Sequence, residues 1–150
     1  SNSILKKLIK DANLVDVFHL LGQRNDIARI TASLDLACLT SWSESFGISL
    51  IESMACGVPC VSTDCGTQSS ILGDSVWTVP IGDMESLAKK CIEFLSLPKN
   101  ERLLIGEAMR ARVLDHFELS TVVKHYEVMY LDLVAKRMAN KNAILNCGVY

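Results

Sequence analysis

Residues 43–66 read SESFGISLIESMACGVPCVSTDCG, a loop followed by an apolar segment, a Gly-Val-Pro turn and a second apolar segment. The spacing of the apolar residues in 48–55 predicts a helix. Gly57 and Pro59 predict its end, because glycine favours the position after a helix and proline cannot continue one. Residues 60–63 have the apolar, β-branched composition of a buried strand. A helix that leads directly into a strand indicates an α/β fold.

The start of this helix is a predicted phosphate site. The first backbone N–H groups of a helix have no partner inside it, and the helix dipole adds positive charge there. We expect the N–H groups of Gly47, Ile48 and Ser49 to converge on one anion. Glu52 lies about one turn further on and leans back toward the helix start. Its carboxylate only accepts hydrogen bonds, which suits a vicinal diol such as ribose, while Glu44 would approach from the other side.

A longer pattern runs from residue 41 to residue 66: Ser-x-x-Glu-x-Phe-Gly-x-x-x-x-Glu-x-Met-Ala-x-Gly-x-Pro-x-Val-x-Thr-Asp-x-Gly. It resembles the donor-site signature of the retaining family 4 (group 1) glycosyltransferases, which have the GT-B fold. The order of the remaining elements, from residues 15–22 to the terminal helices, is similar to that family as well. Two glutamates with seven residues between them would be a weak signal alone. Phe-Gly, Gly-x-Pro and Thr-Asp-x-Gly in the same register make the pattern specific.

The resemblance implies a role for each residue of the segment. Glu52 would hold the ribose hydroxyls of the nucleotide. Glu44 would lie beside the donor sugar and its reacting region, where it positions the donor rather than acting as a base. A single glutamate in a sequence is more often an ordinary exposed acid than a ligand-binding residue. The full pattern makes the ligand-binding role the favoured interpretation for both glutamates. The implied site has Glu44 as its catalytic-site residue, and its donor-binding residues are Ser45, Phe46, Gly47, Ile48, Ser49, Glu52, Gln23 and Arg24.

Gln23 and Arg24 follow the first expected strand and therefore lie at the expected binding edge. In the family that the sequence resembles, this loop borders the nucleotide base. An ordinary turn from strand to helix explains the same residues equally well.

Length, composition and charge set the general class. The 150 residues are 49% hydrophobic, with mean hydropathy +0.26 and a net charge of −2, which fits one domain or part of one with a substantial core. The absence of a basic cluster argues against nucleic acid as a partner. No signal peptide and no apolar run of about 18 residues are present, so we expect a cytoplasmic protein without a membrane span. Peripheral contact of the full-length protein with a membrane is left open.

The six cysteines favour reduced structural thiols over a metal site or disulfides. Cys56, Cys60 and Cys65 lack the Cys-x-x-Cys spacing of zinc sites, and no histidine lies near them in the sequence. Asp64-Cys65-Gly66 also differs from the Asp-x-Asp motif that coordinates a divalent cation in the other large glycosyltransferase architecture. We therefore expect no metal and no cofactor apart from the donor substrate.

The expected elements alternate, which predicts a Rossmann-like, doubly wound parallel sheet with long helices at the C-terminus. Ligands of such sheets bind beyond the carboxyl ends of the strands, here residues 40–47 and 63–66. Asp83 is the expected N-cap of one helix, and Pro98 is expected to begin another. Helices are expected at 4–11, 27–33, 48–55, 68–72, 84–96, 99–117 and 120–140, and strands at 15–20, 35–39, 60–63 and 76–79.

The beginning of the chain departs from the family. The donor-binding domain of the family normally starts with two more strands and a helix, which carry a Gly-rich turn and an Arg and a Lys for the diphosphate. We therefore expect residues 1–150 to be a partial C-terminal nucleotide-sugar-binding domain of a two-domain enzyme, whose N-terminal domain binds a glycan or lipid-linked acceptor. Alone, the chain is expected to lack transferase activity. We also expect it to self-associate, or to pair residues 15–20 directly with 35–39.

Two other classes of function stay open. One is a non-catalytic nucleotide-sugar-binding or interaction module, because a fold does not determine a function. The other is an epimerase or phosphorylase of the same architecture, which would need a different donor-site pattern or a cofactor lysine. Retaining transfer of a sugar from a nucleotide diphosphate donor to a hydroxyl acceptor ranks ahead of both.

Overall fold

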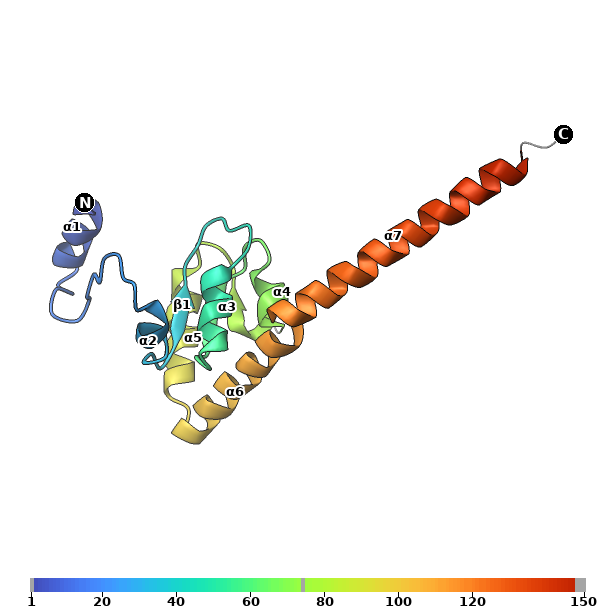
Figure 1. Cartoon of the computed structure of the whole chain (residues 1–150). Helices are drawn as coiled ribbons and strands as arrows, with labels where there is room; N and C mark the ends of the chain where they lie inside the picture. The colour runs from blue at the N-terminus through green and yellow to red at the C-terminus, as the bar shows by residue number, and fades with distance from the viewer. Residues whose placement is uncertain (1, 74, 148–150) are drawn as a thin grey trace.

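The computed structural model describes residues 2–73 and 75–147, which form a small α/β body with a helical extension at each end (Figure 1). Its strands are β1 (Ala37–Leu39), β2 (Cys60–Thr63) and β3 (Thr78–Val79). Its helices are α1 (Ser3–Asp11), α2 (Ile27–Thr31), α3 (Ile48–Ala55), α4 (Gln68–Leu72), the 3-10 turn η1 (Ser75–Trp77), α5 (Met84–Leu95), α6 (Lys99–His116) and α7 (Leu119–Cys147).

The strands form one parallel sheet in the order β1-β2-β3, with Ala37 beside Cys60 and Ser62 beside Thr78. Successive residues of a strand face opposite sides of the sheet, and both sides are covered. On one side, Ala37 and Cys60 pack with buried residues of α3, α4 and α6. On the other side, Val61 packs with Leu87 of α5. Helices on both faces of a parallel sheet confirm the doubly wound fold that the sequence predicts.

The strand predicted at residues 15–20 is wrong. The N–H groups of Val17 and Phe18 both donate to the carbonyl oxygen of Leu14, at 3.2 and 2.8 Å, so this segment turns instead of extending. Among the described residues no strand lies beside it, and a strand without a neighbour leaves its backbone groups unpaired. The expected pairing of 15–20 with 35–39 is wrong for the same reason, since β1 pairs only with β2 in the described part of the chain. Apolar residues of the segment line a pocket against α1 instead, namely Val15, Phe18 and Leu20 with Ile9.

Several other predicted boundaries are confirmed, and some move by a few residues. Helix α3 and strand β2 have the predicted limits. Asp83 caps α5, because its carboxylate accepts a hydrogen bond of 2.9 Å from the N–H group of Ser86. Pro98 precedes the first residue of α6. The predicted strand at 76–79 is shorter, since η1 takes its first half, and β1 begins at Ala37 rather than at residue 35.

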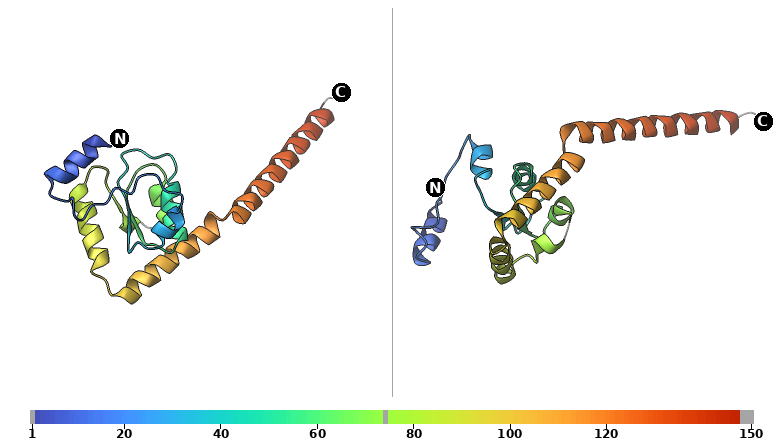
Figure 2. Two further views of the ribbon diagram at one scale, coloured as in Figure 1. Left: turned by 60° about the vertical axis from the view of Figure 1, so that its left-hand side comes forward. Right: turned by 90° about the horizontal axis from the view of Figure 1, so that it is seen from below.

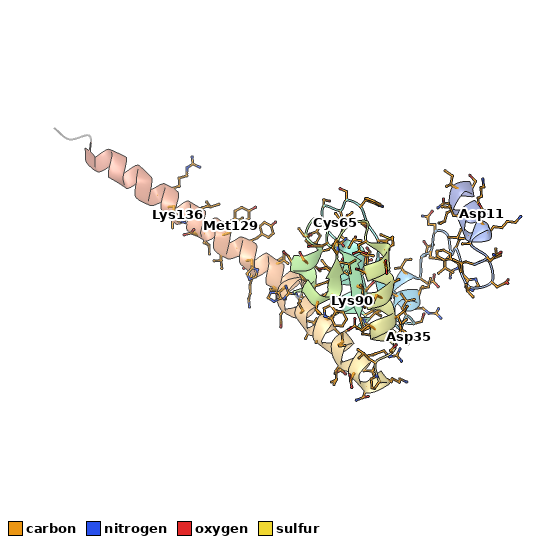
Figure 3. The ribbon with its side chains drawn as sticks, turned by 180° about the vertical axis from the view of Figure 1, so that it is seen from behind. Asp11, Asp35, Cys65, Lys90, Met129 and Lys136 are labelled. Carbon is orange, nitrogen blue, oxygen red and sulfur yellow. The ribbon has the colours of Figure 1, made fainter. Side chains whose placement is uncertain are left out.

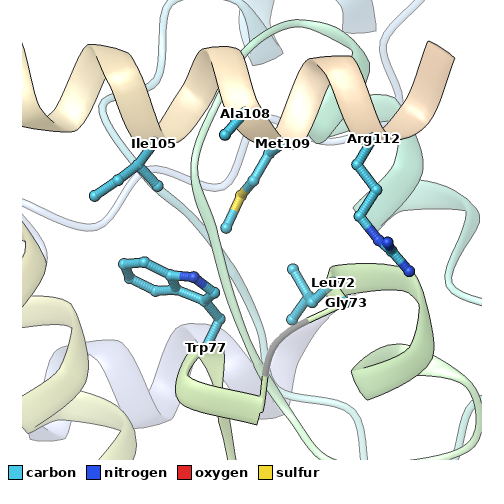
Figure 4. A pocket seen from close by; sticks show the side chains of 7 residues that line it. All are labelled: Leu72, Gly73, Trp77, Ile105, Ala108, Met109 and Arg112. Atoms are coloured by element: carbon cyan, nitrogen blue, oxygen red, sulfur yellow. The ribbon is translucent and has the colours of Figure 1, made fainter. Parts of the chain in front are cut away.

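Helix α6 packs against α3, and a glycine on α6 allows the close approach. A β-carbon on Gly106 would lie 2.1 Å from the carbonyl oxygen of Gly57, so only glycine fits at position 106. Further along, the Arg112 Nε and Nη2 atoms donate to the carbonyl oxygens of Ile71 and Ser70, both at 2.7 Å. These bonds satisfy the last carbonyl groups of α4, which have no partner within the helix. Arg112 also borders a pocket of about 280 Å³ between α4 and α6, lined by Leu72, Gly73, Trp77, Ile105, Ala108 and Met109 (Figure 4).

Helix α7 runs away from the sheet, and Met129 and Lys136 lie along the part that projects from the body (Figures 1 and 3). The views in Figure 2 show the same projection from two other directions. Many of its apolar side chains are exposed, including Leu119 at 76% and Leu131 at 71%. No helix within the described residues combines the length and the apolar character that crossing a bilayer requires.

Candidate functional site

The loops that follow the three strands meet at one edge of the sheet. The Thr63 Oγ1 hydroxyl, at the end of β2, donates to the carbonyl oxygen of Ser41, just beyond β1, at 2.6 Å. The Trp42 ring reaches the loop after β3, because a β-carbon on Gly82 would lie 3.3 Å from its Cη2 atom. These contacts confirm that residues 40–47 and 63–66 share the carboxyl edge, where ligands of parallel sheets bind.

The loop that carries Glu44 is held from two sides. On one side, Gly66 approaches the Glu44 carbonyl so closely that a β-carbon there would lie 1.8 Å from its oxygen. On the other side, the Phe46 ring packs edge-on against Phe117 at the end of α6, with ring centroids 6.4 Å apart. Glu44 itself is half-buried, whereas Ser45 and Phe46 are exposed. The backbone is therefore fixed while the side chains at 45 and 46 stay accessible.

The start of α3 differs in one detail from the predicted anion site. Gly47 has φ −77° and ψ 67°, the geometry of an inverse γ-turn, and the Ile48 N–H group donates to the Phe46 carbonyl oxygen at 2.9 Å. The expectation that the Ile48 amide is free is therefore wrong, because the turn uses it. The N–H groups of Gly47 and Ser49 have no acceptor among the described residues. Two amides, rather than three, are therefore left without an acceptor among the described residues; Ser49 is exposed, whereas Gly47 is buried.

Gln68 is a residue that the sequence reasoning missed. It is fully buried, and its Oε1 atom lies 2.5 Å from the Ser62 hydroxyl. Its Cγ atom would lie 3.6 Å from a β-carbon on Gly47, so it packs directly against the start of α3. Its Nε2 atom is buried without a partner among the described residues. The sequence feature that could have indicated Gln68 is its place at the first position of the short helix that follows the Thr-Asp-x-Gly motif.

Glu52 is exposed and lines a pocket of about 290 Å³ between α2 and α3. The rest of the lining is mostly apolar and consists of Ile27, Ala28, Thr31, Ala55 and Cys56. Glu44 is not among the residues that line this pocket. The interpretation that both carboxylates border one ligand therefore stays a prediction.

Arg24 is already paired. Its Nε and Nη2 atoms donate to the two carboxylate oxygens of Asp26, both at 2.9 Å, and this pairing lowers the pKa of Asp26. Gln23 and Arg24 also do not follow a strand, so no strand end brings them to the carboxyl edge. The local charge of Arg24 is matched by Asp26, which leaves less of it for a diphosphate.

The cysteines do not form a metal centre in the described part of the chain, which holds no group of three His, Cys, Asp or Glu side chains suited to a metal ion. The side chain of Cys147 lies outside the described residues. Burial raises the pKa of the Cys60 thiol to about 12. The cysteines found as free thiols are Cys38, Cys56, Cys60, Cys65 and Cys91.

Two comparisons of sequence relate this chain to known proteins. A family model described as "Glycosyl transferases group 1" matches residues 1–112. N-acetyl-alpha-D-glucosaminyl L-malate synthase from Bacillus anthracis is 35% identical over 132 residues, which cover 85% of this chain and 34% of that protein. The chain therefore spans about a third of the length of this curated relative.

Two solved structures are similar in fold. Sucrose-phosphate synthase from Thermosynechococcus elongatus matches with a TM-score of 0.76 and 26% identity, over 88% of this chain and 34% of that one. The C-terminal domain of a glycosyl transferase group 1 family protein from Francisella tularensis matches with a TM-score of 0.65 and 21% identity, over 77% of this chain and 62% of that one. The second likeness concerns the fold alone.

These comparisons agree with the architecture. The parallel sheet covered on both faces, followed by a long terminal helix, is the α/β arrangement of GT-B glycosyltransferases, as the sequence predicts. The matched segment covers more than half of the chain and includes Glu44, Glu52 and the loops at the carboxyl edge. This chain belongs to the group 1 glycosyltransferases.

Proposed function

We propose that this chain binds the nucleoside diphosphate sugar of a retaining glycosyltransferase, whose full-length form moves the sugar to a hydroxyl group of a glycan or lipid-linked acceptor. The observation that carries the proposal is the start of α3, where the amides of Gly47 and Ser49 lack acceptors among the described residues. Membership of the group 1 family supports the same reading.

The free amides suit the diphosphate of the donor. As the bond from the sugar to the diphosphate breaks, negative charge grows on the leaving oxygen. Backbone N–H groups at a helix start stabilise such charge without having to reorganise. Gln68 supports this role, because it packs against Gly47 from inside the fold. Glu44 would position the sugar, and no side chain is assigned as a nucleophile.

The pocket beside Glu52 suits the nucleoside. An ionised carboxylate accepts two hydrogen bonds from a vicinal diol, and the apolar residues Ile27 and Ala28 would face the base. Its volume of about 290 Å³ is at the small end for a ligand pocket, which fits a nucleoside rather than a whole donor.

The diphosphate also needs cations, because two carboxylates near it would otherwise repel it. Arg24 already shares its charge with Asp26, so it would supply only part of the neutralisation. We assign the neutralising Arg or Lys to a segment of the full-length protein outside these 150 residues, and we assign no metal to the reaction.

Calorimetry with uridine, adenosine and guanosine diphosphates, on the full-length protein, tests the binding step. We expect one diphosphate to bind at least about tenfold more tightly than its nucleoside. A donor-turnover assay, with the anomeric configuration of the product read by NMR, tests the chemistry. Retention supports the proposal, and inversion contradicts the retaining mechanism. Binding without turnover would favour a non-catalytic module, and binding of none of the three diphosphates would overturn the proposal.

A further inference from the structure

Two cysteines from distant parts of the sequence face each other where α5 packs beside the edge strand β1. The Sγ atoms of Cys38, on β1, and Cys91, on α5, lie 3.9 Å apart. Cys38 stands beside Val61 in the strand register, and Val61 packs with Leu87 of α5 on that face of the sheet. Cys91 packs against the same cluster. The pair is therefore set by the packing of α5 on the sheet, not by a loop.

The geometry allows a bond with little movement. A disulfide needs its sulfurs about 2.05 Å apart, so these two atoms must approach by roughly 2 Å. Rotation of a cysteine side chain about χ1 moves its sulfur by roughly 2 Å. Both thiols are free, so no existing disulfide has to break. Cys38 is exposed on the edge strand and Cys91 is half-buried, so a small reagent reaches the pair from solvent.

We propose that Cys38 and Cys91 are a redox-active dithiol, which closes to a disulfide between β1 and α5 on reaction with a small-molecule disulfide such as oxidised glutathione. One cysteine thiolate attacks a sulfur of that disulfide, and its S–S bond breaks to release one small thiolate. The second cysteine then loses its proton to solvent and attacks the mixed disulfide, which releases the second small thiolate. The protein loses two electrons and two protons, and the reagent is reduced to two thiols.

Closure would act on the rest of the fold through β1. This strand runs directly into the loop that carries Glu44, so a covalent link to α5 would hold the strand that positions that loop. Although Cys38 is exposed at the edge of the sheet, partial burial of its sulfur and the neighbouring Cys91 thiol raise the pKa of Cys38 to about 12. The thiolate of Cys38 is therefore scarce near neutral pH, and we expect closure to be slow there and to speed up as the pH rises.

Peptide mapping after oxidation tests the pair. The reduced chain is incubated with reduced and oxidised glutathione in several ratios, remaining thiols are blocked with iodoacetamide, and the protein is cut after Lys, Arg and Glu. These cuts place Cys38 within residues 30–44 and Cys91 within residues 91–93. Cys56, Cys60 and Cys65 fall in a separate peptide, residues 53–85, and Cys147 falls in residues 142–150, so a link between the two short peptides is unambiguous.

We expect this link to be the main product in the folded chain and its thermal unfolding midpoint to rise by several degrees on oxidation. Cys38→Ser and Cys91→Ser should each abolish both effects, whereas Cys56→Ser should leave both unchanged. In concentrated urea the same mixture should give links scattered over all cysteines. A folded chain that forms only glutathione adducts, or that links Cys38 or Cys91 to other partners, would overturn the proposal. So would a chain whose pair stays reduced at every ratio while Cys56 reacts.

Discussion

Gly66 approaches the backbone of Glu44 so closely that a β-carbon on Gly66 would lie 1.8 Å from the Glu44 carbonyl oxygen. Gly66 also has φ +60°, a backbone conformation that residues with a side chain rarely adopt. The loops after β1 and β2 therefore interlock through backbone atoms. The position of the loop that carries Glu44 therefore depends on glycine at position 66.

We predict that Gly66→Ala destabilises the chain by about 3 kcal/mol. About 1 kcal/mol comes from the left-handed backbone, and the remainder comes from the clash with the Glu44 carbonyl. Urea denaturation measures the change. Gly57→Ala is the matched control, because Gly57 has φ +73° but open space around its added β-carbon. It should cost only about 1 kcal/mol, and equal losses in the two variants would contradict the clash.

Sequence periodicity was sufficient for the parts of the fold that are completed by local contacts. Helix α3 and strand β2 follow from an apolar run with a Gly-x-Pro stop, and the cap at Asp83 follows from local hydrogen bonding. The segment 15–20 has the composition of a strand, but a strand forms only with a neighbour, which composition does not supply. Periodicity does not predict the γ-turn at Gly47 or the pairing of Arg24 with Asp26, because both depend on particular hydrogen bonds rather than on a repeating pattern.

A second prediction concerns Arg112, which donates two hydrogen bonds of 2.7 Å to the last carbonyl groups of α4. Arg112→Lys should destabilise the chain by about 2 kcal/mol, because an ammonium group cannot reproduce the planar fork that reaches both carbonyls. Chemical denaturation gives the value. Arg137→Lys, at an exposed position of α7, should change stability by less than about 0.5 kcal/mol. A loss in Arg112→Lys as small as in this control would show that the fork contributes little.

A third prediction concerns pH and Asp83. The hydrogen bond from the Ser86 N–H group holds the pKa of Asp83 below its usual 3.8, so the folded chain binds this proton more weakly than the unfolded chain. The stabilisation is complete above pH 3.8 and is lost as the pH falls through the lower folded value. Asp83→Ala should lower the unfolding midpoint at neutral pH, and the gap to wild type should shrink in acid. A gap that stays constant across this range would mean that the charge plays no part.

A fourth prediction separates the roles of the two glutamates in the full-length enzyme. Glu52→Ala removes charge-assisted hydrogen bonds to the ribose, worth roughly 1.5 to 3 kcal/mol each, so nucleoside diphosphate affinity should fall by about tenfold to a hundredfold. Glu44→Ala should lower turnover more than affinity, because this residue is assigned to the reacting sugar rather than to the nucleotide. Calorimetry and steady-state kinetics measure the two effects. Glu107→Ala removes a comparable charge from an exposed position on α6 and should leave both quantities unchanged. Wild-type turnover in both site variants would remove the glutamate pair from the donor site.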